Sequence, residues 1–127
     1  MSDVEEVREL LVMARKDLKA IRAMGDNPEF DDEIFGFHAQ QAIEKALKAW
    51  IALLDVEYPL KHNLTTLLRL LDSQGVEVSK WLGLARYNAF AVQFRYEQSE
   101  PSGASLNRAD VVRDVTGIVE HVERLVG

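Results

Sequence analysis

Residues 35–54 read FGFHAQQAIEKALKAWIALL, and we expect the rest of the chain to pack around this stretch. Apolar residues recur in it at intervals of three and four, which is the spacing of one face of an α-helix. Small alanines on this face allow a neighbouring helix to come close, and Trp50 fills a wider gap. The apolar face consists of Ala39, Ala42, Ile43, Ala46, Leu47, Trp50, Leu53 and Leu54.

The other flank of this helix is polar. It carries His38, Gln41, Lys45 and Lys48, with Gln40 and Glu44 beside them. Glu44 and Lys48 stand four residues apart in the order that favours an ion pair, which contributes only a few tenths of a kcal/mol on an exposed face. We interpret this pair as support for the helix.

Composition restricts both the class of protein and its chemistry. The chain has 127 residues, which predicts a single domain over residues 1–127, and no apolar run is long enough to span a membrane. Because cysteine is absent, disulfides, thiolate nucleophiles and cysteine-ligated zinc are excluded. The net charge of −6 opposes unspecific coating of nucleic acid, although a local basic face can still bind a phosphate or a short RNA.

The beginning of the sequence predicts a cytoplasmic protein, because acidic residues follow Met1 where a secretory signal would have basic ones. We expect no cofactor and no metal. Asp31, Asp32 and Glu33 are consecutive, so their side chains point in different directions around a helix and suit its N-terminal charge better than a metal ion.

Helical spacing and end signals predict an all-α protein. We expect helices over residues 3–24, about 31–55, about 64–75, from 79 onward and 107–126. Their end signals are Ser2 with Glu5, Gly25, Asn63, Gly75, and Asn107 with Asp110, while residues 98–105 (QSEPSGAS) predict a polar loop. Short connections favour antiparallel neighbours, so the predicted fold is an antiparallel four-helix up-and-down bundle. The short leucine-rich helix at 64–75 is expected to lie across it.

The fourth predicted helix places two polar residues in line with apolar ones. Asn88 and Arg95 share a helical stripe with Trp81 and Leu84. Buried polar groups need partners, so Asn88 and Arg95 are candidates for a hydrogen-bond network or a ligand contact.

Three segments of the sequence are informative when they are considered together. They are residues 37–51 (FHAQQAIEKALKAWI), His62-Asn63-Leu64 with the leucine-rich turn after it, and Phe94-Arg95-Tyr96. In this order they resemble the HEPN (higher eukaryote and prokaryote nucleotide-binding) domain, a family of small helical bundles. Many HEPN proteins are metal-independent ribonucleases in which an arginine precedes a histidine by four to six positions and two such motifs meet across a dimer. Here Arg95 matches the arginine, but Ser99, Glu100, Pro101 and Ser102 occupy the histidine window. The resemblance therefore implies no catalytic residue in this motif.

Metal-free RNA cleavage needs a base that activates the 2′-hydroxyl, and imidazole suits this task at neutral pH. The sequence offers His38, His62 and His121, of which His38 is the one that can approach the fourth helix. By resemblance, His38, Lys45, Arg95 and Tyr96 would line a polar cleft between the second and fourth helices. The complete candidate site for a nucleotide is His38, Gln41, Lys45, Asn88, Arg95 and Tyr96.

Three functions follow from these observations. The first is a non-catalytic nucleotide-binding or interaction module, which by resemblance would work with a minimal nucleotidyltransferase in a toxin–antitoxin pair. The second is an RNA-cleaving toxin with a displaced base, supplied by His38 or Glu100. The third is a purely structural or interaction protein, a helical bundle that functions through its dimer interface. The apolar stripes are wider than a four-helix core requires, which leaves apolar surface for self-association. A homodimer is compatible with all three.

Overall fold

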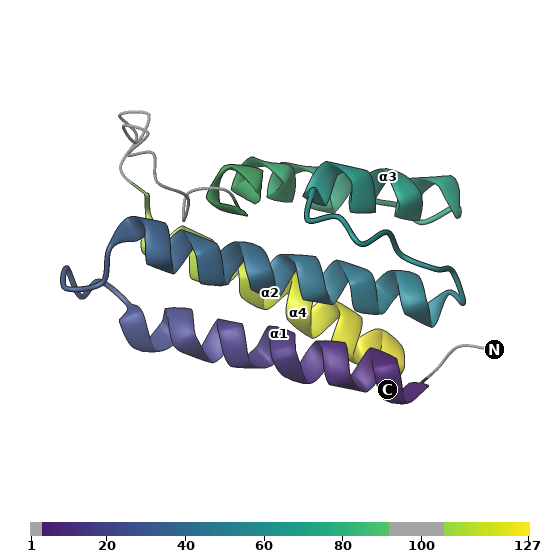
Figure 1. The fold of residues 1–127 in the computed structure, drawn as a ribbon, viewed down its shortest axis with the longest axis horizontal. Coiled ribbons are helices and arrows are strands. Elements are labelled where there is room, and N and C mark those ends of the chain that lie inside the picture. The colour runs from purple at the N-terminus through teal and green to yellow at the C-terminus, as the bar shows by residue number, and fades with distance from the viewer. Residues whose placement is uncertain (1–3, 92–105) are drawn as a thin grey trace.

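The computed structural model describes residues 4–91 and 106–127, and this part of the chain is entirely helical (Figure 1). The helices are α1 (Val4–Met24), α2 (Asp32–Leu53), α3 (Leu64–Ser73), η1 (Ser79–Ala91) and α4 (Arg108–Val126). In Figure 1, α1, α2, η1 and α4 alternate in direction, which confirms the predicted up-and-down bundle. Within the described ranges no helix is both long and apolar enough to cross a membrane.

The short helix α3 differs in orientation from our expectation. It runs alongside α2 and in the same direction, rather than across the bundle (Figure 1). The chain after α2 turns back along that helix, where Gln40 Nε2 donates to the carbonyl of His62 at 3.2 Å. This bond fixes the start of α3 beside α2, and the two helices remain in contact.

The core surrounds α2, which packs against α1, α3, η1 and α4. The predicted apolar face of α2 is confirmed from Ala39 to Trp50, whereas Leu53 is half-buried and Leu54 is exposed at the helix end. Fully burying a large aliphatic side chain contributes about 1.5–3 kcal/mol relative to leaving it exposed. The largest side chains that are fully buried are Phe35, Ile43, Leu47 and Ile51 of α2, Leu18 and Ile21 of α1, Leu64, Leu67, Leu68 and Leu71 of α3, Tyr87 of η1 and Ile118 of α4.

Several helix ends are those that the sequence predicts. Gly25 ends α1 with a φ of +48°, a left-handed conformation that glycine adopts without steric cost. Asn63 caps α3 by accepting from the backbone N–H groups of Thr65 and Thr66 at 2.9 and 3.3 Å. Asn107 caps α4 through the N–H of Asp110 at 3.1 Å. The predicted Ser2 cap and the predicted loop at 98–105 lie outside the described residues.

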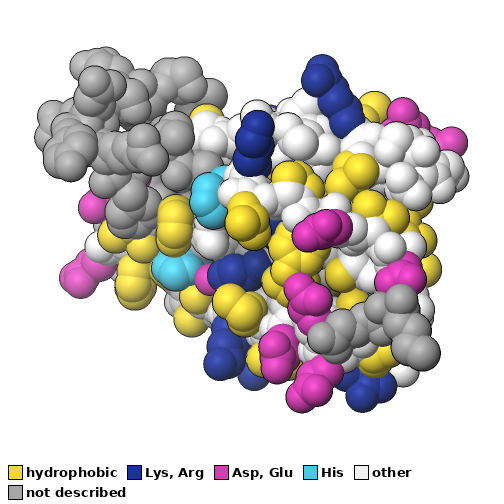
Figure 2. All heavy atoms as spheres, turned by 45° about the vertical axis from the view of Figure 1, so that its right-hand side comes forward, with side chains coloured by type: hydrophobic (Ala, Val, Ile, Leu, Met, Phe, Trp, Pro, Cys, Tyr) yellow, Lys and Arg dark blue, Asp and Glu magenta, His cyan; other side chains and the backbone are white. Residues whose placement is uncertain are grey.

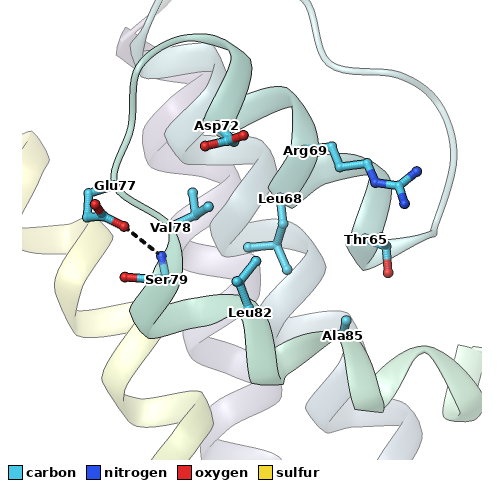
Figure 3. A pocket seen from close by; sticks show the side chains of 9 residues that line it. All are labelled: Thr65, Leu68, Arg69, Asp72, Glu77, Val78, Ser79, Leu82 and Ala85. Carbon is cyan, nitrogen blue, oxygen red and sulfur yellow. Dashed lines mark hydrogen bonds between the residues drawn. The ribbon is translucent and has the colours of Figure 1, made fainter.

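Helix η1 is a 3-10 helix, whereas we expected α-helical spacing in this segment. Its buried side chains recur every three residues, at Trp81, Leu84 and Tyr87, and Val78 just before the helix continues the series. A 3-10 helix has three residues per turn, so these side chains form one straight row against the core. The N–H of Ser79 donates to Glu77 Oε1 at 3.0 Å and fixes the start of the helix (Figure 3).

Helices α2 and η1 come very close at Gly36. A Cβ atom added to this glycine would lie 2.2 Å from Cδ1 of Phe90. Glycine in a helix interior costs about 1 kcal/mol relative to alanine. Gly36 is therefore explained by the ring of Phe90 that lies where its side chain would be.

Arg108 connects the first turn of α4 to the α1–α2 loop. Its guanidinium donates to the carbonyls of Gly25 (3.0 Å), Asn27 (3.1 Å) and Phe30, and to Asp32 Oδ1 at 2.9 and 3.0 Å. The group also lies 4.9 Å above the ring centre of Phe35, and its side chain is only 10 % exposed. These contacts use the planar fork of donors that distinguishes arginine from lysine.

Candidate functional site

Asp17 of α1 organises two of the predicted site residues. Its carboxylate lies 3.0 Å from Nδ1 of His38 and accepts a hydrogen bond from Nζ of Lys45 at 2.9 Å. The side chain of Asp17 is 14 % exposed, so the cluster lies in the α1–α2 interface. His38 and Lys45 are thus brought together, and both face α1.

Glu44 organises the second polar group of α2. It accepts from Gln40 Nε2 at 2.9 Å and from Lys48 Nζ at 3.0 Å, and Nδ1 of His62 lies 3.0 Å from Oε1. Gln41, another predicted site residue, joins this network by donating to Gln40 Oε1 at 2.7 Å. The interpretation of Glu44 and Lys48 as a pair on an exposed face is wrong. Their side chains are 5 % and 10 % exposed, because the returning segment before α3 covers this flank.

The environment of Glu44 keeps its carboxylate ionised. Burial alone would raise its pKa, but the hydrogen bonds from Gln40, Lys48 and His62, together with the charge of Lys48, outweigh burial and lower the pKa. A buried charge of this kind is stable only while its partners remain in place.

His62 combines an exposed ring with a buried carboxylate partner. Its side chain is 68 % exposed, whereas that of Glu44 is 5 % exposed. When Nδ1 donates to a carboxylate, the second ring nitrogen is an acceptor that can take a proton. Sequence alone did not indicate this pairing, because Glu44 precedes His62 by 18 positions and lies on a different element.

Tyr58 closes the same region on its outer side. The ammonium of Lys48 lies 5.6 Å from the centre of its ring, and its hydroxyl donates to Glu6 Oε1 at 2.6 Å. This hydrogen bond, assisted by burial and by the charge of Glu6, raises the pKa of Tyr58 to about 12. Tyr58 thereby connects α1 to the segment between α2 and α3.

Asn88 of η1 lies apart from these groups and contacts the start of α3. Its Oδ1 accepts from the N–H of Leu64 at 2.6 Å, and its Nδ2 donates to Thr65 Oγ1 at 3.1 Å and Asn63 Oδ1 at 3.3 Å. The structure thus joins His38 to Lys45 and Gln41 to Gln40, and it pairs Asn88 with α3. Arg95 and Tyr96 lie outside the described residues.

His121 of α4 lies between two indole rings. The centres of Trp50 and Trp81 are 4.9 and 5.1 Å from that of the imidazole. Burial lowers the pKa of His121, and the positive charges of Arg124 and Lys80 lower it further. The contacts join α2, η1 and α4 around one titratable group.

The surface has two notable hollows beside η1. The first, of about 350 Å³, lies between α3 and η1, with Leu68, Val78, Leu82 and Ala85 around it and Arg69, Asp72 and Glu77 at its margins (Figure 3). The second, of about 440 Å³, lies between η1 and α4 and is lined by basic side chains. On the face drawn in Figure 2, hydrophobic, basic and acidic side chains are intermixed.

No set of three histidine or carboxylate side chains within residues 4–91 and 106–127 is placed to hold a metal ion. The polar groups of the site instead neutralise one another. Asp17 is shared by a histidine and a lysine, and so is Glu44. The networks around Asp17 and Glu44 thus stabilise the packing of α1, α2 and the start of α3.

The comparison with protein families agrees with this architecture. The family model described as HEPN domain matches residues 7–126. The chain belongs to the HEPN family. No curated protein and no solved structure matches it. The match spans Asp17, Glu44, Asn88 and His121 together with the residues that they contact.

Proposed function

We propose that this HEPN domain is a non-catalytic module that binds a nucleotide and works as a homodimer with a minimal nucleotidyltransferase partner. The observation that carries the proposal is the placement of two of its three histidines. His38 pairs with Asp17 in the α1–α2 interface, and His121 contacts the rings of Trp50 and Trp81. Together with the missing histidine after Arg95, these contacts support binding rather than cleavage.

The partner and the dimer follow from the family resemblance. Small HEPN proteins are frequently paired with minimal nucleotidyltransferases in toxin–antitoxin arrangements. Exposed apolar side chains on α1, namely Val4, Val12 and Met13, are available for self-association. Neither glycine-rich phosphate loop nor P-loop motif occurs in the sequence, so nucleotide contacts would come from side chains such as Arg95.

Calorimetric titration with ATP, GTP and a short RNA, beside an RNA cleavage assay, tests the proposal. We expect saturable nucleotide binding that is lost in Arg95→Ala, with the RNA left intact. Cleavage that disappears in Arg95→Ala would contradict a non-catalytic role. If the protein neither bound a nucleotide nor cleaved RNA, the result would favour the structural bundle.

The second candidate function is a metal-independent ribonuclease with a displaced base, and His62 is the observation that favours it. Its exposed imidazole is oriented by a buried carboxylate, which is an arrangement suited to general base catalysis. His62→Asn and Glu44→Gln separate this role from a structural one. A base at His62 predicts that both variants lose any RNA cleavage, whereas a structural role predicts loss of stability alone.

A further inference from the structure

The groove between η1 and α4 concentrates positive charge on an acidic protein. Lys80 and Arg86 line it from η1, and Arg113 and Arg124 line it from α4. Asp114 is the one carboxylate among the described residues of its lining. The whole chain has a net charge of −6, so the sign of this groove is opposite to that of the molecule.

The 3-10 geometry of η1 aligns the basic residues of one wall. Lys80, Gly83 and Arg86 are three residues apart, and three residues make one turn of a 3-10 helix, so they share one edge. On the other wall, Arg113, Gly117 and Arg124 are separated by four and seven residues, which places them on one face of an α-helix. Two parallel rows of cations therefore face the groove.

Glycines keep the middle of both rows open. A Cβ atom added to Gly83 would meet no atom within 4 Å, and one added to Gly117 would come only within 3.7 Å of Trp81. Open space between cations at each end gives an elongated anion room to lie between the helices.

The cations differ in how far they are already neutralised. Arg86 is paired with Asp114, and Arg113 lies 3.2 Å from Asp110. Lys80 and Arg124 are exposed, and neither takes part in an ion pair among the described residues, while the ammonium of Lys80 lies 5.1 Å from the ring centre of Trp81. The positive charges of both residues also lower the pKa of His121, so both lie close enough to this imidazole to act on it.

We propose that the η1–α4 groove binds the phosphate chain of a small phosphorylated ligand, with Lys80 and Arg124 as the principal contacts. Cations in two rows call for a ligand with several anionic oxygens, and guanidinium groups suit phosphates through paired donors. Trp81 is only 7 % exposed, so a base cannot stack on it, and the ligand is recognised by its phosphates. The inference rests on the proposed nucleotide-binding role and places its phosphate contacts outside α2.

Calorimetric titration with inorganic tripolyphosphate, ATP and adenosine tests this site. We expect tripolyphosphate and ATP to bind with similar affinity and adenosine not to bind. In Lys80→Ala/Arg124→Ala both affinities should fall by about ten-fold or more, because charge-assisted hydrogen bonds are lost. The matched control is Lys16→Ala/Lys19→Ala, which removes the same charge from exposed positions of α1 and should bind as the wild type does.

A second variant tests the groove without removing a cation. A Cβ atom at Gly83 would meet nothing within 4 Å, and this position lies on the same edge as Lys80 and Arg86. We therefore expect Gly83→Glu to abolish binding by its added negative charge while the circular dichroism spectrum stays unchanged. Wild-type protein that fails to bind tripolyphosphate, or Lys80→Ala/Arg124→Ala that binds it normally, would overturn the inference. An ATP affinity more than about ten-fold above that of tripolyphosphate would contradict recognition by phosphates alone.

The outcomes also separate this inference from the proposed function. ATP binding that is lost in Arg95→Ala but kept in Lys80→Ala/Arg124→Ala supports the proposed function and overturns the groove. Binding of tripolyphosphate and ATP that depends on Lys80 and Arg124 but is unchanged in Arg95→Ala supports the groove and contradicts the contact that the proposed function assigns to Arg95.

Discussion

Glu44 holds three polar groups from two segments of the chain around a single carboxylate. Gln40 and Lys48 belong to its own helix, while His62 belongs to the segment that leads into α3. Removing one member of such a buried pair leaves the other charge without compensation, which costs more than the pair itself contributes. The stability of this region therefore depends on the ionised state of Glu44.

We predict that Glu44→Gln lowers the free energy of unfolding by about 3 kcal/mol, because Lys48 remains buried without its partner. Urea denaturation followed by circular dichroism measures the change. Glu120→Gln is the control, because Glu120 is 46 % exposed and lies 4.0 Å from Arg15, and such a surface pair contributes about 1 kcal/mol or less. Glu44→Gln/Lys48→Met should recover much of the loss; a double variant less stable than Glu44→Gln would contradict this account.

His121 predicts a stability that depends on pH. Its pKa in the folded state lies below the ordinary value of 6.5, so the unfolded state binds its proton more readily. The contribution of the neutral ring is fully present above pH 6.5 and is lost as the pH falls through the lowered pKa. The free energy of unfolding should therefore decline over this window, and His121→Phe should make that decline smaller.

Fluorescence offers a direct readout, because the two tryptophans of the chain, Trp50 and Trp81, both contact His121. A protonated imidazole quenches a neighbouring indole more strongly than a neutral one. We expect the emission to fall on acidification with a midpoint below 6.5, and to lose this step in His121→Phe. An unchanged step in the variant would assign the titration to another group.

At the level of elements, the contact between α2 and η1 fixes where each helix lies. Gly36 and the ring of Phe90 occupy adjoining space, with no room for a methyl group between them. The row of Trp81, Leu84 and Tyr87 then faces the core, and the adjoining edge with Lys80, Gly83 and Arg86 faces the groove. Local sequence could not predict this geometry, because the same apolar residues fit α-helical and 3-10 spacing over a few turns.

We predict that Gly36→Ala destabilises the protein by about 1–3 kcal/mol, since overpacking against Phe90 outweighs the higher helix propensity of alanine. Thermal unfolding measures the difference. Gly83→Ala is the matched control, because its new methyl group would meet nothing within 4 Å and the melting temperature should change little. Phe90→Ala should make Gly36→Ala nearly neutral. If Gly36→Ala were harmless in the wild-type background, the close contact would not limit the packing.

For the whole molecule, Arg108 joins parts of the chain that lie far apart in sequence. It holds three carbonyls of the α1–α2 loop and Asp32 at the start of α2. Arg15 of α1 makes a paired contact with Glu123 near the other end of α4, which raises the pKa of the arginine further. Helix α4 is thus bound to the rest of the bundle by charge at both ends and by its valines between them.

We predict that Arg108→Met lowers the free energy of unfolding by about 1–3 kcal/mol, because three carbonyls of the α1–α2 loop and Asp32 lose the donor that joins them to α4. Arg113→Met is the control, since its side chain is 73 % exposed. Amide hydrogen exchange should show faster exchange in residues 25–31 for Arg108→Met alone. Equal effects of the two substitutions would mean that the guanidinium contacts contribute little.

The sequence predicted the helices, several of their caps and the apolar face of α2, since these depend on local periodicity. It did not predict that the segment before α3 covers Glu44, because spacing within one helix cannot show what packs over its polar flank. The contacts of Arg108 were also missed, since they join residues more than seventy positions apart. His38 and Lys45 were correctly placed on one flank of α2, but Asp17, their partner, lies on another helix and gave no signal.

The 3-10 form of η1 also sets the length of one side of the bundle. Each residue advances about 2.0 Å along a 3-10 helix but about 1.5 Å along an α-helix. Over the 13 residues of η1, conversion to an α-helix would shorten this side by about 6 Å. The same conversion would rotate each of Lys80, Gly83 and Arg86 by roughly 60° relative to the one before it. The row of η1 that faces α4 therefore exists only while η1 keeps its 3-10 form.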